Sequence, residues 1–241
     1  MFRELKRKYR KIHALDTMFE IGKEKEYFKI GSRAYEICDP LISDKGKDLR
    51  ILDFPSGYGR VLRYFRNEHP AAVIFACELD SRMLDFVSNQ FDAIPIQSKD
   101  NFDIELPGNL DLIFMGSLLT HLSEHQWEKI FNLIEPCIKV GGHIVFTTHG
   151  RLHFKMASEG HTIFGDLIDV VQLFHDAKFS GFAYAPYDLS WPSFGLSLSS
   201  PDWIMKKITK WPNLKVHSFS EASWGQDVWI LEKIDYRLSE Y

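Results

Sequence analysis

Short apolar runs alternate with segments of helical periodicity along most of this chain. The apolar runs, each long enough for one buried strand, lie near residues 50–54, 72–77, 94–97, 110–115 and 143–148. Between them apolar residues recur at helical spacing, as Trp127, Ile130 and Phe131 do after the capping box Ser123-x-x-Gln126. This alternation predicts an α/β domain whose mostly parallel sheet is covered by helices on both faces.

The remaining segments predict additions to that domain. Residues 2–42 have a helical pattern, and residues 214–221 and 226–233 predict two closing strands joined by Ala-Ser-Trp-Gly. Residues 150–200 depart from the alternation: a helical segment at 162–177 precedes a stretch with the composition of a hairpin or lid. Ser200-Pro201-Asp202 then predicts the start of another helix, which ends near Pro212.

The sequence ILDFPSGYGR at residues 51–60 joins the first strand to a helix and predicts a ligand-binding loop. Gly57 and Gly59 allow a positive φ and a close approach of a ligand to the backbone. Open α/β sheets bind ligands at the carboxyl ends of their strands, where this loop lies. Leu62 stands where a dinucleotide-binding loop has its third glycine, and no Lys-Ser/Thr pair follows as in a P-loop. A glycine-rich turn also occurs for purely local reasons.

The loop resembles motif I, D-x-G-x-G-x-G, of the class I S-adenosylmethionine-dependent methyltransferases. Asp53, Gly57 and Gly59 match, and Pro55 takes the place of the first glycine. Glu78 ends the second strand, where that family has a carboxylate for the ribose hydroxyls; the alternative is a solvated strand-end residue. The order strand, Gly-Ser-Leu-Leu-Thr-His-Leu, helix, Gly-Gly and strand over residues 110–150 is also similar to the family.

The resemblance covers residues 49–150 well and implies a fold, a cofactor and a set of binding residues. The fold would be a Rossmann-like, seven-stranded, mostly parallel sheet with an antiparallel last strand and an inserted lid after strand five. Residues 1–48 would be helices that cover the cofactor, and residues 49–241 the methyltransferase domain, with its insertion at 150–200. The residues expected to bind S-adenosylmethionine are Tyr27, Gly31, Asp53, Pro55, Ser56, Gly57, Gly59, Arg60, Glu78, Leu79, Ser98, Gly116 and Ser117.

Four residues are candidates for a general base. His149 is the first of them, because it ends strand five beside the expected transfer site and imidazole accepts protons near pH 7. His149 would alternatively cap the strand through a backbone hydrogen bond. His121 would act as a base or position the loop after strand four, and Asp227 and Asp188 are further candidates.

The motifs of nucleic-acid methyltransferases help to limit the class of methyl acceptor. The chain has no Asn-Pro-Pro-aromatic motif, and its one Pro-Cys pair, Pro136-Cys137, lies at a predicted helix end, where we do not expect a nucleophile. These features favour an oxygen or nitrogen atom of a small-molecule or sugar-type acceptor over a nucleobase, and we expect methylation at oxygen. Five aromatic residues form either a pocket wall for such an acceptor or the core of the insertion: Tyr184, Tyr187, Trp191, Phe194 and Trp224. A non-catalytic cofactor-binding module and a nucleic-acid methyltransferase remain alternatives.

The composition of the chain bears on the number of domains and on nucleic-acid binding. The 241 residues fit one domain with an insertion, and 45% hydrophobic with 26% charged residues is typical of a globular protein. A net charge of −4 argues against a broad nucleic-acid surface, although the start of the chain is basic. That basic stretch would bind RNA or anionic lipid, or simply be solvated while Phe2, Leu5, Tyr9 and Ile12 pack on the domain.

Cysteine usage and the absence of long apolar runs predict the compartment. Cys38, Cys77 and Cys137 have no metal-binding spacing, so we expect no bound metal. We expect these cysteines to be reduced thiols in the core. No apolar run approaches membrane-spanning length, and the charged first residues do not resemble a signal peptide. We therefore expect a cytoplasmic protein without a membrane partner; the oligomeric state does not follow from the sequence.

Overall fold

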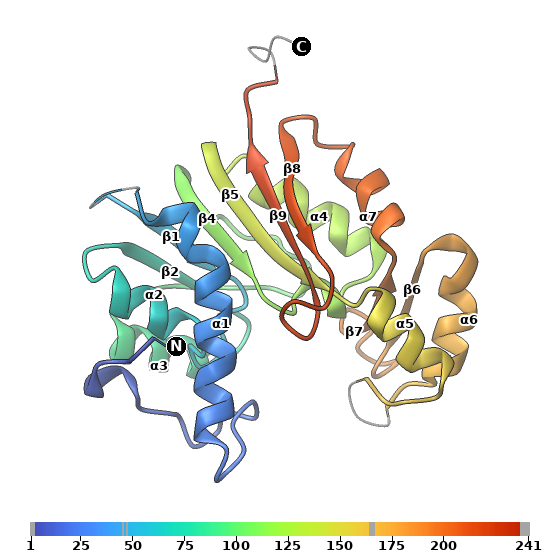
Figure 1. The fold of residues 1–241 in the computed structure, drawn as a ribbon, viewed down its shortest axis with the longest axis horizontal. Helices are drawn as coiled ribbons and strands as arrows, with labels where there is room; N and C mark the ends of the chain where they lie inside the picture. Colours follow the sequence, from blue (N-terminus) through green and yellow to red (C-terminus); the bar gives the residue numbers. More distant parts are fainter. Residues whose placement is uncertain (1–2, 45, 47, 164–166, 237–241) are drawn as a thin grey trace.

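A seven-stranded sheet forms the centre of the computed structural model, which describes residues 3–44, 46, 48–163 and 167–236. Its strand order is β3-β2-β1-β4-β5-β9-β8, and β9 runs antiparallel to both β5 and β8 (Figure 1). The strands are β1 (Arg50–Asp53), β2 (Val73–Glu78), β3 (Ile94–Gln97), β4 (Leu110–Met115), β5 (Ile138–Thr148), β8 (Leu214–Ser220) and β9 (Asp227–Lys233). The predicted sheet, with its antiparallel last strand, is confirmed.

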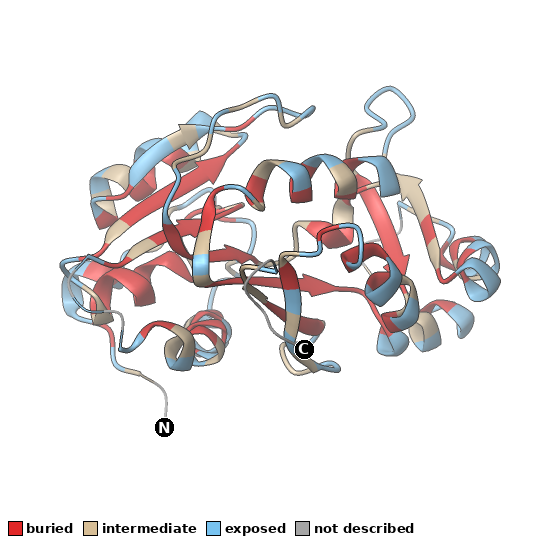
Figure 2. Cartoon of the chain, turned by 90° about the horizontal axis from the view of Figure 1, so that it is seen from above, coloured by how far each residue is buried: buried red, intermediate tan, exposed pale blue. Residues whose placement is uncertain are grey.

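Helices cover both faces of this sheet, as predicted, because the central strands β1, β2, β4 and β5 carry apolar side chains on both sides. One face packs against α1 (Glu24–Ile42), α2 (Leu62–Glu68) and α3 (Ser81–Phe91). The opposite face packs against α4 (Glu124–Ile134) and α7 (Pro201–Ile208). Two apolar cores result, and Figure 2 shows the buried strands crossing the molecule between helices whose outer sides are exposed.

Capping residues set the helix boundaries as the sequence predicted. The Ser123–Gln126 capping box begins α4, and Ser200 caps α7 with Pro201 in its first turn.

The strand order of the sheet reverses between β1 and β4. The chain passes from β1 to β2 and β3 on one side of β1, and then returns to β4 on its other side. In an open α/β sheet this switch point leaves a crevice at the carboxyl ends of the two strands.

Residues 150–200 form a separate small unit beside β5. It contains α5 (Arg151–Ser158), α6 (Val170–Ser180) and the antiparallel hairpin β6 (Phe182–Pro186) and β7 (Gly195–Ser199), which enclose their own apolar cluster. The hairpin was predicted, but α5 was not. The helix predicted at 162–177 begins later, at Val170, because Asp169 caps it by accepting from the Gln172 N–H. Part of the predicted segment, 164–166, lies outside the described residues.

The N-terminal helices predicted within residues 2–42 are confirmed for α1, which begins at Glu24, but not for the residues described before it. Within residues 3–23, the only regular element is a 3₁₀ turn, η1 (Arg7–Tyr9), and the chain then runs irregularly to α1. The buried Arg63 guanidinium accounts for this, since it donates to the carbonyls of Tyr9 and Lys11 in place of intrahelical partners (both 3.3 Å). Leu5 and Tyr9 are buried in the core, as one interpretation of this stretch expected; Phe2 lies outside the described residues.

Among the described residues, no helix has both the length and the apolar character needed to cross a bilayer.

Candidate functional site

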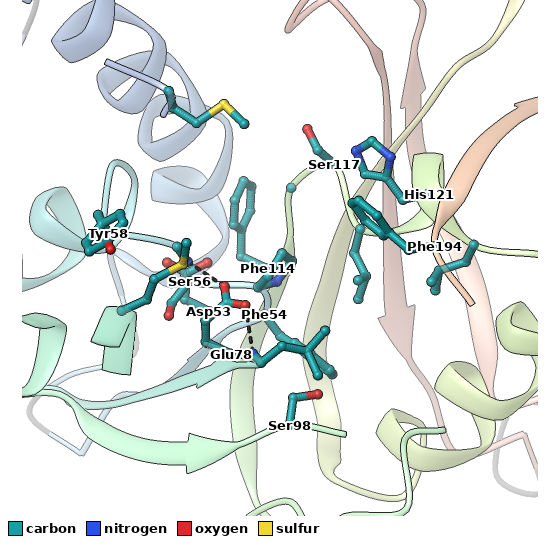
Figure 3. A pocket seen from close by; sticks show the side chains of 18 of the residues that line it. Asp53, Phe54, Ser56, Tyr58, Glu78, Ser98, Phe114, Ser117, His121 and Phe194 are labelled. Atoms are coloured by element: carbon teal, nitrogen blue, oxygen red, sulfur yellow. Dashed lines mark hydrogen bonds between the residues drawn. The ribbon is translucent and has the colours of Figure 1, made fainter. Parts of the chain in front are cut away.

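A cavity of about 360 Å³ opens at the carboxyl ends of β1 and β4, at the switch point of the sheet (Figure 3). The structure brings most of the predicted cofactor residues together around it. Those that line the cavity are Asp53, Pro55, Ser56, Gly57, Arg60, Glu78, Leu79, Ser98, Gly116 and Ser117. Of the candidate bases only His121 lines it, and Tyr27, Gly31 and Gly59 lie outside the lining.

The two glycines of the loop after β1 have different surroundings. Gly57 has φ +51°, and a Cβ built there would meet no atom within 4 Å, so this position faces the open cavity. Gly59 has φ +73°, but its Cβ would lie 2.6 Å from the Phe91 ring. The loop therefore uses Gly57 to leave space beside the backbone and Gly59 to let α3 pack close to it.

Glu78 fixes this loop from the neighbouring strand. Its carboxylate accepts hydrogen bonds from the backbone N–H of Gly57 (2.9 Å) and of Leu79 (2.7 Å). Burial raises the pKa of Glu78, and the backbone donors oppose that rise. A carboxylate oxygen accepts more than one hydrogen bond, so Glu78 retains acceptor capacity toward the cavity that it lines.

Three buried polar atoms in the cavity wall lack hydrogen-bond partners among the described residues: Asp53 Oδ2, Ser56 Oγ and Ser98 Oγ. Burial, and then the charge of Glu78, raise the pKa of Asp53 well above its usual range. Unsatisfied buried polar groups are costly and rare in native proteins. Their concentration in one cavity fits a ligand that carries several hydroxyl or amino groups.

Tyr27 and Gly31, both on α1, support the site from behind its wall. The Tyr27 hydroxyl donates to Asp16 (2.6 Å) and accepts from Arg63 (3.1 Å). A Cβ at Gly31 would lie 2.1 Å from the carbonyl oxygen of Arg60, so this glycine allows α1 to pack onto the loop. The segment Asp16–Met18 contributes to the cavity wall instead. No motif in the sequence marks that segment, because its position depends on contacts with Arg63 and Tyr27.

His121 ends the 3₁₀ turn η2 (Leu119–His121) after β4 and lines the cavity. Its Nδ1 lies 2.9 Å from the carbonyl oxygen of Gly195 and 3.0 Å from the Tyr187 hydroxyl. Because the carbonyl can only accept, it favours the neutral tautomer with hydrogen on Nδ1 and the lone pair on Nε2. Burial lowers the pKa of His121, so the neutral form predominates at pH 7.

His149 lies behind the cavity wall and is only 4% exposed. Its Nδ1 is 3.2 Å from the Ser197 carbonyl oxygen, and its ring lies against that of His153, with the centroids 4.1 Å apart. Burial, followed by the neighbouring histidines, lowers the pKa of His149 well below its usual value. These contacts match the structural role considered for His149 and give it no direct access to the cavity.

The two aspartates also lie outside the cavity lining. Asp227 begins β9, is buried, and accepts from the Ala222 N–H (2.9 Å) while packing against Gly150; burial raises its pKa. Asp188 is exposed and accepts from the backbone and side chain of Ser190 (2.8 and 2.7 Å), which lowers its pKa. Of the four candidate bases, His121 therefore lies in the cavity lining, and His149, Asp227 and Asp188 lie outside it.

The turn between β6 and β7 supplies one wall of the cavity. Trp191 and Phe194 line it, and the Trp191 indole N–H donates to Asp100 on the far side (3.0 Å). Phe194 lies against His121, with ring centroids 4.8 Å apart (Figure 3). Of the other aromatic residues considered for a pocket wall, Trp224 also lines the cavity, while the Tyr184 hydroxyl holds the turn through the Pro192 carbonyl (2.7 Å).

Comparison with known families identifies the same region of the chain. A family profile described as a methyltransferase domain matches residues 51–142. No curated protein matches the sequence significantly.

Solved structures resemble the fold over most of the chain at low sequence identity. An S-adenosylmethionine-dependent methyltransferase from Mesorhizobium loti has a TM-score of 0.59 at 13% identity, covering 83% of this chain and 98% of the other. The PH0226 protein from Pyrococcus horikoshii OT3 has a TM-score of 0.58 at 12% identity, covering 95% and 100%. DhpI, in a complex with SAM and HEP, has a TM-score of 0.52 at 14% identity, covering 92% and 98%.

Proposed function

We propose that the chain is a class I S-adenosylmethionine-dependent methyltransferase that transfers the methyl group to a hydroxyl oxygen of a small-molecule or sugar-type acceptor. One observation carries this proposal. The cavity that holds the unsatisfied polar atoms of Asp53, Ser56 and Ser98 is also lined by a half-buried imidazole, that of His121, whose lowered pKa favours the neutral form. A polar cofactor and a base would therefore share one cavity.

The cavity wall would offer partners for the ribose and for the carboxylate of the cofactor. Glu78 would accept hydrogen bonds from the ribose hydroxyls, and the backbone at Gly57 would lie against the cofactor. The Arg60 guanidinium, within 6.0 Å of the Trp224 ring centroid, would pair with the carboxylate of the methionine part. S-adenosylmethionine supplies an electrophilic methyl group, so the protein's task is to orient the acceptor, exclude water and accept a proton.

His121 is the residue that we assign to proton acceptance. The Gly195 carbonyl holds its Nδ1 hydrogen, which directs basicity to Nε2, and the Phe194 ring shields it from bulk water. A hydroxyl acceptor gains most from such a base, because an alcohol must lose its proton as the new carbon–oxygen bond forms. The lowered pKa of His121 keeps it unprotonated at neutral pH.

The walls contributed by the insertion support a small acceptor. Trp191 and Phe194 offer aromatic surface, and Ser193 and Gln126 offer hydrogen-bonding groups within the same cavity. Aromatic walls with a few polar groups are typical of small-molecule sites. The net charge of −4 gives no general attraction for a nucleic acid. As part of the proposal we place the protein in the cytoplasm, since its three cysteines are buried and form no disulfide within the described chain.

The test has two steps. Calorimetric titration with S-adenosylmethionine and with NADH should show binding of the first alone. Methyl-labelled cofactor is then offered with pools of hydroxylated small molecules and sugars, of amines, and of RNA, and label in the products is measured. Transfer to the hydroxylated pool that is lost in His121→Gln is expected. Binding without transfer to any pool would support a non-catalytic module, and salt-sensitive transfer to RNA a nucleic-acid enzyme; either result would contradict the proposal.

A further inference from the structure

Away from the cavity, three side chains with metal-binding atoms meet on the β5–β9–β8 side of the sheet. His143 on β5, Glu232 on β9 and His217 on β8 each place one donor atom within 4.8 Å of the other two. None of them lines the cavity, which opens at the other end of β5. In Figure 1, α1 lies over β1 and β4, whereas β8 and β9 face the viewer with no described helix in front of them.

Strand register accounts for this meeting. His143 and Glu232 are directly paired across β5 and β9, so their side chains project from the same face. On β8, the pairing shifts between Val216 and Ser218, which leaves His217 as the extra residue of a bulge. Lys215, two residues before His217, pairs directly with Glu232, so the alternation of side chains along β8 places His217 on the same face as Glu232 and His143. The imidazole rings of His143 and His217 lie edge to face with centroids 5.1 Å apart.

The geometry needs only small side-chain movements to hold an ion. Donor atoms bound to one tetrahedral zinc ion lie about 3.4 Å apart, as follows from bond lengths of about 2.1 Å. The His217 Nδ1 is already 3.5 Å from Glu232 Oε2. The side chain of His217 is 43% exposed and therefore has room to adjust toward an ion, while the side chain of His143 is buried.

We propose that His143, Glu232 and His217 form a binding site for a divalent transition-metal ion, with Zn²⁺ the best fit. Two imidazoles and one carboxylate form a known zinc ligand set, whereas Mg²⁺ and Ca²⁺ prefer oxygen ligands alone. The ion joins three adjacent strands and ties the edge strand β8 to the sheet. Water completes the coordination on the exposed side. This site is independent of methyl transfer.

One neighbour competes with the ion. The Lys215 ammonium lies 2.9 Å from Glu232 Oε2, and an ammonium there repels a cation. The Lys215 side chain is 52% exposed, so it can turn to solvent when an ion binds. Replacing Lys215 with an uncharged residue should therefore strengthen binding, which gives the proposal a test that improves the site as well as tests that damage it.

The experiment titrates the full chain, freed of metal with a chelator, with Zn²⁺ against a chromophoric competitor at neutral pH, and records the melting temperature with and without the ion. We expect binding of one ion and a higher melting temperature, with no effect of Mg²⁺. His217→Ala and Glu232→Gln should each weaken binding by at least about tenfold, the lower end of what even a supporting residue contributes. Lys215→Met should tighten it.

His161→Ala is the matched control, because His161 is also exposed and lies 3.6 Å from a single carboxylate, that of Glu159. It should bind Zn²⁺ like the wild type. Equal affinity of the wild type and His217→Ala, or an equal loss in His161→Ala, would overturn the proposal, as would binding that Lys215→Met leaves unchanged. Circular dichroism of each metal-free variant verifies that the fold is retained, since the two ligands exchanged are not in the apolar core.

Discussion

The carboxylate of Glu78 accepts a hydrogen bond from the backbone N–H of Gly57 over 2.9 Å, and this bond joins the end of β2 to the loop after β1. The same carboxylate is assigned to the ribose of the cofactor. Glu78 therefore organises the loop and lines the cavity at once, so experiments on either residue must separate loop structure from ligand contact.

The two glycines of the loop should respond differently to alanine. Gly57→Ala adds a methyl group beside the cavity and forces a positive φ at a cost of about 1–2 kcal/mol, so it should weaken S-adenosylmethionine binding and lower stability modestly. Gly59→Ala should reduce stability more, because its Cβ meets the buried Phe91 ring. Calorimetry and urea denaturation of both variants measure the two effects. Unchanged affinity of Gly57→Ala for S-adenosylmethionine would show that the cofactor does not contact this loop.

Glu78→Gln should cost about 1.5–3 kcal/mol of cofactor binding, the usual contribution of hydrogen bonds to a charged group. The amide oxygen can still accept one bond from the loop, so the fold should persist. The comparison that matters uses a cofactor analogue without ribose hydroxyls. If Glu78 binds the ribose, the variant and the wild type should bind that analogue almost equally. An equal loss with both ligands would mean that Glu78 acts only through the loop.

His121→Gln should lower kcat by about a hundredfold or more while leaving cofactor affinity nearly unchanged. In the wild type, the rate should fall on the acid side with an apparent pKa below 6.5, because burial lowers the pKa of His121 from that value. His149→Gln is the matched control, since His149 lies outside the cavity lining, and it should retain turnover and the acid limb. Loss of turnover in His149→Gln together with normal turnover in His121→Gln would instead indicate that His149 is the general base.

Buried histidines should make the protein less stable in acid. The folded-state pKa of His149 lies well below 6.5, so between these values the unfolded chain binds more protons and unfolding becomes easier as the pH falls. His153, whose pKa burial lowers to about 4, acts in the same direction. The raised pKa values of Asp53 and Glu78 act oppositely.

A comparison of the wild type with His149→Gln isolates the contribution of His149 to the pH dependence of stability. Below about pH 6.5 the free energy of unfolding should fall less steeply in the variant, by up to about 1.4 kcal/mol per pH unit, because one proton no longer binds on unfolding. Urea denaturation at several pH values measures the two slopes, and the carboxylate contributions cancel between the proteins. Parallel slopes would show that His149 does not take up a proton on unfolding in this range.

Arg63→Met should loosen the segment that carries Asp16 to Met18 over the cavity. It removes donors to the Tyr9 and Lys11 carbonyls and to Tyr27, and we expect a loss of about 2–4 kcal/mol in stability. Limited proteolysis should then cleave before α1. Arg66→Met is the control, because Arg66 is also buried but bonds the Phe91, Pro70, Ala72 and Asp92 carbonyls. Equal cleavage in both variants would indicate general destabilisation.

Local sequence determined the elements around the site. The strands ending at Asp53, Glu78 and Met115 were predicted within a residue or two, because apolar runs and turn residues act over short distances. Ser123 and Gln126 likewise fixed the start of α4 through bonds between near neighbours. Since parallel strands place their carboxyl ends at one edge, the order of these elements already predicted which loops would meet.

Tertiary contacts decided what each of those residues does. Gly57 and Gly59 look alike in sequence, but only the position of Phe91, from a different helix, makes Gly59 a packing residue. The sequence made both His149 and His121 candidate bases, and contacts with the insertion distinguish them. The Ser197 carbonyl contacts His149 outside the cavity lining, whereas the Gly195 carbonyl contacts His121 within it. The predicted helical pattern extended over residues 2–42, yet the buried Arg63 bonds the carbonyls of Tyr9 and Lys11 in an irregular segment before α1. Such contacts join residues far apart in the chain, so no local pattern contains them, and only the folded structure assigns these roles.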